Sequence, residues 1–231
     1  MANNTIKKVK IQKAKASDML LLAAITFFSQ LVEPIFHYLI VWTPLIDNVP
    51  LTDMWWTLIL RLLCCASWGL TVYLIVIVSR NNGFDPIKIN GKPTNLQWVM
   101  TAAVTFVFVA VMVILDGGIK ETLLGLIELN SAVYTVTRFI FWAFQVAVIV
   151  LVLSLGQKFG DLLMKKGNEF VPFGGIVLGL CTVLVNVVTG GFSLNTAIMF
   201  GIQVIYGMVF VCSGKRALVA APFIYIMFLV M

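Results

Sequence analysis

One long apolar stretch, residues 131–156, constrains the fold of this chain more than any other feature. At a helical rise of ~1.5 Å per residue, about 20 apolar residues cross the hydrocarbon core of a bilayer, so this stretch predicts a membrane-spanning helix. It nevertheless carries Arg138 and, seven residues later, Gln145, which share one face of a helix. A guanidinium in hydrocarbon costs roughly 2.5–3.5 kcal/mol on insertion scales. We therefore expect the other segments to pack around this helix.

Six further apolar segments follow the same pattern and are separated by short polar loops. They cover residues 18–42, 54–79, 96–115, 171–190, 196–213 and 217–231, the last being short for a span. Hydrophobic residues make up 61% of the chain and charged residues 11%, against about 25% charged in soluble domains. The sequence therefore predicts an all-α, polytopic transmembrane helical bundle of about seven spans. Residues 18–231 form a single domain, which residues 1–17 precede as a basic tail.

The distribution of charge predicts the orientation of the bundle. The net charge is +6, and the tail holds five lysines and no acid. Basic residues return after the second, fourth and sixth spans, where Lys215 and Arg216 stand. By the positive-inside rule the N-terminus is cytoplasmic, and the loops near Asp47, Glu121 and Gly191 lie outside. This pattern indicates a multi-pass protein of a bacterial inner membrane, in contact with the lipid bilayer, and argues against nucleic acid as a partner.

Polar side chains inside the predicted spans form the candidate site. With the N-terminus inside, six of them fall ~5–15 Å beneath the outer surface, and Gln145 lies deeper. A buried charge is costly alone, so we expect Glu33 to pair with Arg61 or Arg138. Two interpretations stay open, a structural ion pair or a polar cavity that binds a ligand or peptide, and the surplus arginine suits an anionic ligand. The six residues are Glu33, His37, Arg61, Arg138, Asn186 and Gln203.

Two local patterns predict backbone features of the spans. Pro34 follows Glu33 directly and should kink the first span, because proline lacks the backbone N–H and crowds the preceding turn. Gly175 and Gly179 have the G-x-x-x-G spacing that allows close contact between membrane helices.

The inventory of reactive residues argues against catalysis. His37 is the one histidine, and no HExxH, GxSxG or P-loop motif occurs. Glu33 and His37, at i and i+4, offer two ligand positions but no second histidine completes a metal site. The four cysteines lie in apolar runs without a CxxC pair. We therefore expect no catalytic residue, no metal and no cofactor.

From the fourth span onward, four segments match the layout of a known family. They read TRFIFWAFQVAVIVLVLSLGQKFGD, VPFGGIVLGLCTVLVNVVTGG, FGIQVIYGMVF and APFIYIMF. In spacing they resemble the four core helices of the CAAX-protease and bacteriocin-processing (CPBP) family of membrane proteins. Protease members of that family carry paired glutamates and an arginine on the first core helix, and histidines on later ones. The matching positions here hold Gln145, Val146, Val150 and Asn186, so the resemblance implies the fold without its catalytic set, a pseudoenzyme.

These observations predict a non-catalytic membrane protein that binds a partner protein, peptide or ligand in a polar cavity of the outer leaflet. The resemblance adds an immunity-like role as one form of such binding. Two alternatives stay open. One is a substrate-binding component of a transporter, and the other is an intramembrane hydrolase of CPBP type with unusual residues.

Overall fold

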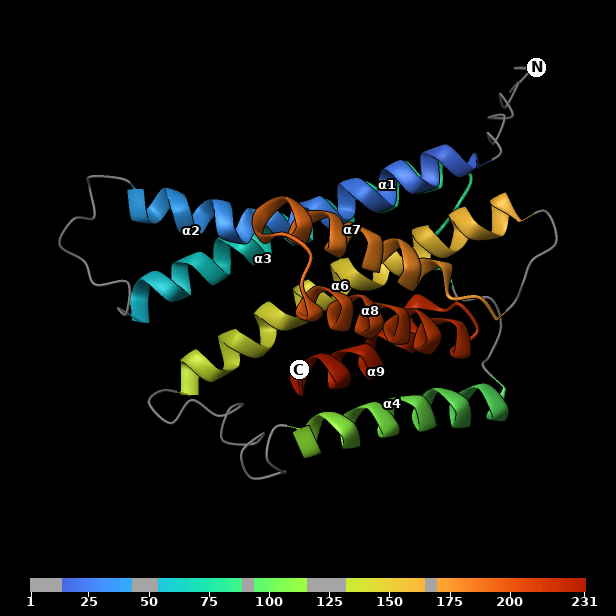
Figure 1. Ribbon diagram of the computed structural model, residues 1–231. Coiled ribbons are helices and arrows are strands. Elements are labelled where there is room, and N and C mark those ends of the chain that lie inside the picture. Colours follow the sequence, from blue (N-terminus) through green and yellow to red (C-terminus); the bar gives the residue numbers. More distant parts are fainter. Residues whose placement is uncertain (1–13, 43–53, 89–93, 116–131, 165–169) are drawn as a thin grey trace, which may run out of the picture.

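The computed structural model describes residues 14–42, 54–88, 94–115, 132–164 and 170–231, and all regular elements within these ranges are helices (Figure 1). The first span of the sequence is α1 (Ala16–Phe28), the 3-10 turn η1 (Ser29–Leu31) and α2 (Val32–Trp42). The remaining helices are α3 (Met54–Asn81), α4 (Asn95–Leu115), α6 (Ala132–Leu163), α7 (Phe173–Gly190), α8 (Leu194–Cys212) and α9 (Ala217–Leu229).

Six helical segments in the described ranges are long and apolar enough to cross a membrane when α1, η1 and α2 are taken as one. The seventh, α9, has 13 residues and is about 20 Å long, shorter than a hydrocarbon core of roughly 30 Å. One side of α9 is fully buried through Ala220, Ile224 and Met227. The chain is therefore a multi-pass helical membrane protein, and the predicted fold class is confirmed.

Helix α6 lies at the centre of the bundle, where α1, α3, α7 and α9 all pack on it (Figure 1). Of the residues in its 18-residue apolar stretch, 61% are buried, a larger share than in any other candidate span in the described ranges. Residues 148–157 are all buried, so the tightest packing involves the second half of α6. The expectation that other segments surround this helix is confirmed, but Arg138 belongs to the less covered first half.

The first span is interrupted next to Pro34, as predicted. The helix tightens to a 3-10 turn at Ser29–Leu31 and resumes with Pro34 in the first turn of α2, where a missing N–H is tolerated. Trp68 is fully buried on α3 and donates its indole Nε1–H to the Ser29 carbonyl oxygen at 3.1 Å. The tryptophan thus fixes the irregular turn against α3.

Helices α7 and α8 approach closely through glycine, which confirms the close contact predicted for this pair of residues. A Cβ atom added at Gly175 would stand 2.6 Å from the Gln203 carbonyl oxygen, and one added at Gly179 would stand 2.7 Å from the Phe200 ring. Gly207 of α8 lies opposite Gly175 across the same contact. Gly175 and Gly207 are required because backbone atoms of the neighbouring helix occupy the space of a side chain, whereas at Gly179 the Phe200 ring occupies it.

We name the basic end of the bundle as the end where α3, α6 and α8 finish and α1, α4 and α9 begin, on the right in Figure 1. Arg80, Lys88, Lys158, Lys215 and Arg216 all belong to it. Gly191 lies in the turn between α7 and α8 at the opposite end. Most of the predicted tail, 1–17, and the loop positions Asp47 and Glu121 lie outside the described residues. A cytoplasmic basic end therefore stays a prediction.

Candidate functional site

Two arginines of the predicted site rest on aromatic rings. The Arg61 guanidinium carbon on α3 lies 3.9 Å from the centroid of the Tyr134 ring on α6, and Arg61 Nη1 donates to the Tyr134 carbonyl oxygen at 3.1 Å. Arg138 lies 4.3 Å from the centroid of the Trp142 ring, one turn further along the same helix. At Arg61, the ring face and the carbonyl oxygen of Tyr134 stabilise the cation without cancelling its charge.

Glu33 and His37 lie beside this cluster on α2, but the predicted ion pair is not formed. Within the described ranges, no ion pair within 4 Å joins Glu33 to Arg61 or Arg138. Glu33 is close enough to His37 and Arg61 for a longer-range attraction, and His37 is exposed. Pairing was expected because a lone buried charge is costly, yet Glu33 is only partly buried. Arg61 is instead stabilised by Tyr134.

This geometry predicts weak coupling between Glu33 and Arg61. We expect Glu33→Gln and Arg61→Gln to have additive effects on unfolding free energy within about 1 kcal/mol, far below the ~3–5 kcal/mol typical of a broken buried pair. Arg61→Lys should lose most of the unfolding free energy that the contact between Arg61 and Tyr134 contributes, because an ammonium lacks the planar fork that stacks on the Tyr134 ring. A double-mutant cycle on the detergent-solubilised protein measures the coupling. A coupling of 3 kcal/mol or more would restore the ion pair.

We name Arg61 and Arg138, with Glu33 and His37 beside them, the arginine cluster. The amide residues of the predicted site do not join it. Helices α2 and α3 pack on each other and α3 on α6, whereas α7 and α8 pack mainly on each other and α7 on α6. Gln203 lies level with Gly175, and Asn186 is eleven residues further along α7, roughly 16 Å away along the helix axis. The two amides therefore lie apart from each other and from the two arginines, and their depth in the membrane stays a prediction.

The remaining predicted residue, Gln145, is partly buried in the middle of α6. The Oε1 atom of Gln203 is buried and has no hydrogen-bond partner in the described part of the chain. The predicted site thus divides into Glu33, His37, Arg61 and Arg138 around α2, α3 and α6, and separate polar positions at Gln145, Asn186 and Gln203.

A second polar cluster, at the basic end, was missed at the level of sequence. Helix α6 continues to Leu163, seven residues beyond the predicted span, and carries Gln157 and Asp161 on one face. Asp161 accepts hydrogen bonds from Lys215 Nζ at 2.8 and 2.9 Å. Gln157 is 2% exposed and donates through Nε2 to Asp161 Oδ1 at 3.3 Å and to the Val171 carbonyl oxygen at 3.1 Å. The signal in the sequence was the i, i+4 spacing of Gln157 and Asp161.

The turn between α8 and α9 positions Lys215 for this ion pair. Gly214 has φ +74° and ends α8, with its N–H bonded to the Val211 carbonyl and the Lys215 N–H to the Phe210 carbonyl. These are the two hydrogen bonds of a Schellman motif. Lys215 itself has φ +60°, a left-handed conformation that costs a non-glycine residue roughly 1–2 kcal/mol. The ion pair with Asp161 offsets that strain.

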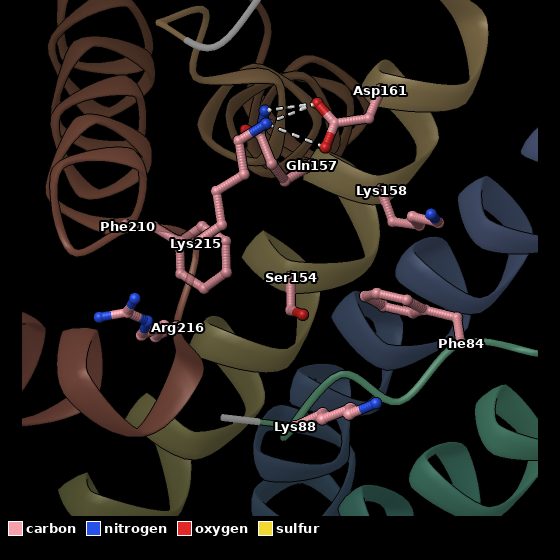
Figure 2. A pocket seen from close by; sticks show the side chains of 10 residues that line it. Phe84, Lys88, Ser154, Gln157, Lys158, Asp161, Phe210, Lys215 and Arg216 are labelled. Carbon is pink, nitrogen blue, oxygen red and sulfur yellow. Dashed lines mark hydrogen bonds and ion pairs between the residues drawn. The ribbon is translucent and has the colours of Figure 1, made fainter. Parts of the chain in front are cut away.

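A cavity of about 270 Å³ lies beneath this turn (Figure 2). Ser154 of α6 is in its wall and donates its hydroxyl to the Pro86 carbonyl oxygen at 3.1 Å. The cavity is lined from α6, the segment after α3, the end of α8 and the α8–α9 turn. Its lining residues are Phe84, Lys88, Ser154, Gln157, Lys158, Asp161, Phe210, Gly214, Lys215 and Arg216.

In the described ranges, no three His, Cys, Asp or Glu side chains are grouped so that they could hold a metal ion. The expected absence of a metal and of a cofactor stays a prediction. The four cysteines are free thiols.

Comparison with known proteins gives no family for this chain: no family model, no curated protein and no solved structure matches it. The resemblance to the CPBP family therefore rests on the quoted segments and stays a prediction.

Proposed function

We propose that this protein acts in the cell membrane by binding, without catalysis, a partner protein or peptide at the arginine cluster of α2, α3 and α6. The supporting observation is the environment of Arg61. Its guanidinium stacks on the Tyr134 ring and donates to the Tyr134 carbonyl oxygen, while Glu33 lies outside ion-pair distance. A carboxylate supplied by a partner would meet a cation that is already oriented. In a low-dielectric setting such a contact is strong and specific.

The CPBP-like fold and an immunity-like role belong to the same proposal. Val146 and Val150, at positions where the protease members carry a glutamate and the arginine, are buried in the apolar core, where they contribute packing. Exposed His37, within the first span, stands without a second histidine, which suits a role in recognition better than one in hydrolysis.

Photocrosslinking tests the proposed function. A photoreactive residue replaces Leu62, which is 63% exposed and adjacent to Arg61, or Leu70, which is 59% exposed and about 12 Å further along α3. In native membranes we expect one defined protein or peptide to cross-link at position 62 and not at 70. Because losing one partner of a desolvated charge pair costs 2 kcal/mol or more, Arg61→Gln should reduce that product about tenfold or more.

The matched control is Arg80→Gln, which removes an exposed arginine from the basic end of the same helix. It should leave the product at position 62 unchanged. Equal cross-linking at positions 62 and 70, or a product that Arg61→Gln does not reduce, would contradict binding at the arginine cluster. Retention of a small molecule and no protein would favour the transporter component instead.

A further inference from the structure

The cavity at the basic end carries more positive charge than its surroundings neutralise. Four of its lining residues are basic and one, Asp161, is acidic. Asp161 is occupied by Lys215, and the nearby Asp85 is occupied by Arg80, whose Nε lies 2.9 Å from the carboxylate. Lys158 Nζ lies 5.5 Å from the centroid of the Phe84 ring, which stabilises the ammonium and leaves its charge in place. The cavity is thus lined by cations without matching carboxylates.

Arg216 is the cation of this cavity with buried donors that lack hydrogen-bond partners, and this points to a ligand. Its Nε and Nη1 atoms are buried, and neither has a hydrogen-bond partner among the described residues. A buried donor without a partner costs about 1–3 kcal/mol, and more when it is charged. Arg216 also directly precedes the first turn of α9, whose N–H groups add positive partial charge at the same place. An anion with several oxygens would satisfy both guanidinium donors at once.

A second cavity adjoins the first and is more apolar. It measures about 490 Å³ and shares Gly214 and Lys215 with the basic cavity. Leu96, Met100, Phe170 and Val211 line it, and the first three are exposed on the outside of the bundle. Polar and apolar space therefore meet at one turn of the chain.

We propose that the basic cavity binds the phosphate group of an anionic ligand, with Arg216 as its principal ligand. Lys158 and Lys88, which Figure 2 shows on the other side of the cavity, add positive charge at longer range. The guanidinium fork matches phosphate oxygens in geometry as well as in charge. Lys215 stays paired with Asp161 and shapes the rim. The cavity, at about 270 Å³, holds a phosphate and a small attached group. The phosphate belongs either to a phospholipid, whose chains follow the apolar cavity, or to a small organic phosphate.

Two probes distinguish these sources. Native mass spectrometry of the full-length protein measures retention of phosphatidylglycerol against phosphatidylcholine after exchange in mixed micelles. Thermal unfolding measures stabilisation by glycerol 3-phosphate over the millimolar range. Preferential retention of phosphatidylglycerol identifies a lipid, and stabilisation by glycerol 3-phosphate identifies a free organic phosphate. Either result supports a phosphate site.

Variants locate the site. Arg216→Gln should weaken binding of the effective probe about tenfold or more, as expected for loss of a charged hydrogen bond. Arg216→Lys should fall between Arg216→Gln and the wild type, since it keeps the charge and loses the fork. Lys158→Gln should weaken binding a few-fold, and it serves as the test if Arg216→Gln does not fold, because Lys158 is partly exposed. Lys15→Gln, which removes an equal charge from an exposed side chain outside the cavity, should change nothing.

Two results would overturn this proposal. The first is a wild-type protein that neither prefers phosphatidylglycerol nor is stabilised by glycerol 3-phosphate. The second is an equal loss of binding in Lys15→Gln and in Arg216→Gln or Lys158→Gln, because binding would then follow net charge rather than the cavity.

Discussion

A methyl group added at Gly207 should destabilise the protein by about 3 kcal/mol, whereas the same group added at Gly201 of the same helix should be neutral or slightly stabilising. The Cβ of an alanine at position 207 would stand 2.6 Å from the Cα and N atoms of Gly175. These are backbone atoms, so α7 and α8 must move apart, and overpacking typically costs 1–3 kcal/mol or more. Position 201 has open space, and alanine favours a helix over glycine by up to ~1 kcal/mol.

The unfolding free energies of the wild type, Gly201→Ala and Gly207→Ala, measured in the same detergent, test this difference in stability. The pair of variants has an internal control, since both changes add one methyl group to α8. Gly175→Ala should reproduce the loss seen for Gly207→Ala, because its Cβ would stand 2.6 Å from the Gln203 carbonyl oxygen. Equal stability of Gly201→Ala and Gly207→Ala would show that α7 and α8 do not meet at these glycines.

Replacement of Gln157 by leucine should cost about 2–4 kcal/mol although the two side chains have similar volumes. Gln157 Oε1 accepts the Gly174 N–H at 3.3 Å in the first turn of α7, where Pro172 at the N-cap makes no side-chain hydrogen bond. Its Nε2 donates to the Val171 carbonyl oxygen. Leucine would leave both backbone groups without this partner at a buried position, at about 1–3 kcal/mol for each group.

The control for this prediction is Gln97→Leu. Gln97 Oε1 also accepts a backbone N–H near the start of a helix, from Thr94 at 3.0 Å, but this bond is exposed. Water can replace it, so the loss should be below ~1 kcal/mol. If Gln157→Leu unfolds no more easily than Gln97→Leu, Gln157 does not join α6 to α7.

The spans were predictable because each rests on local composition. Runs of apolar residues predicted the six long helices, Pro34 predicted the irregular turn of the first, and Gly175 and Gly179 predicted a close helix contact. The end of α6 was not predicted. Its polar residues from Gln157 onward indicate a loop by hydropathy alone, but a helix can continue past the hydrocarbon core when tertiary contacts satisfy its side chains.

The grouping of polar residues was less predictable. Depth from a helix end does not fix which face of a helix meets which neighbour, so the sequence could not show that Asn186 and Gln203 lie on helices that pack apart from the two arginines. An expected ion pair also competes with other ways of stabilising a cation, and Tyr134 provides both a ring and a carbonyl for Arg61. Lys215 and Arg216 were interpreted only as markers of orientation. Their part in a cavity depends on the left-handed turn at Gly214 and Lys215.

The helices cross the membrane, and we predict that the basic end lies in the cytoplasm; cysteine labelling tests this orientation directly. Single cysteines replace Lys88 at the basic end and Phe192 at the opposite end, in a variant whose four native cysteines are alanine. In intact cells, a membrane-impermeant maleimide should label position 192 and leave position 88 unlabelled until the membrane is permeabilised. Labelling of position 88 but not of position 192 would reverse the orientation. Labelling of both positions in intact cells would contradict a bundle that separates its two ends across a membrane.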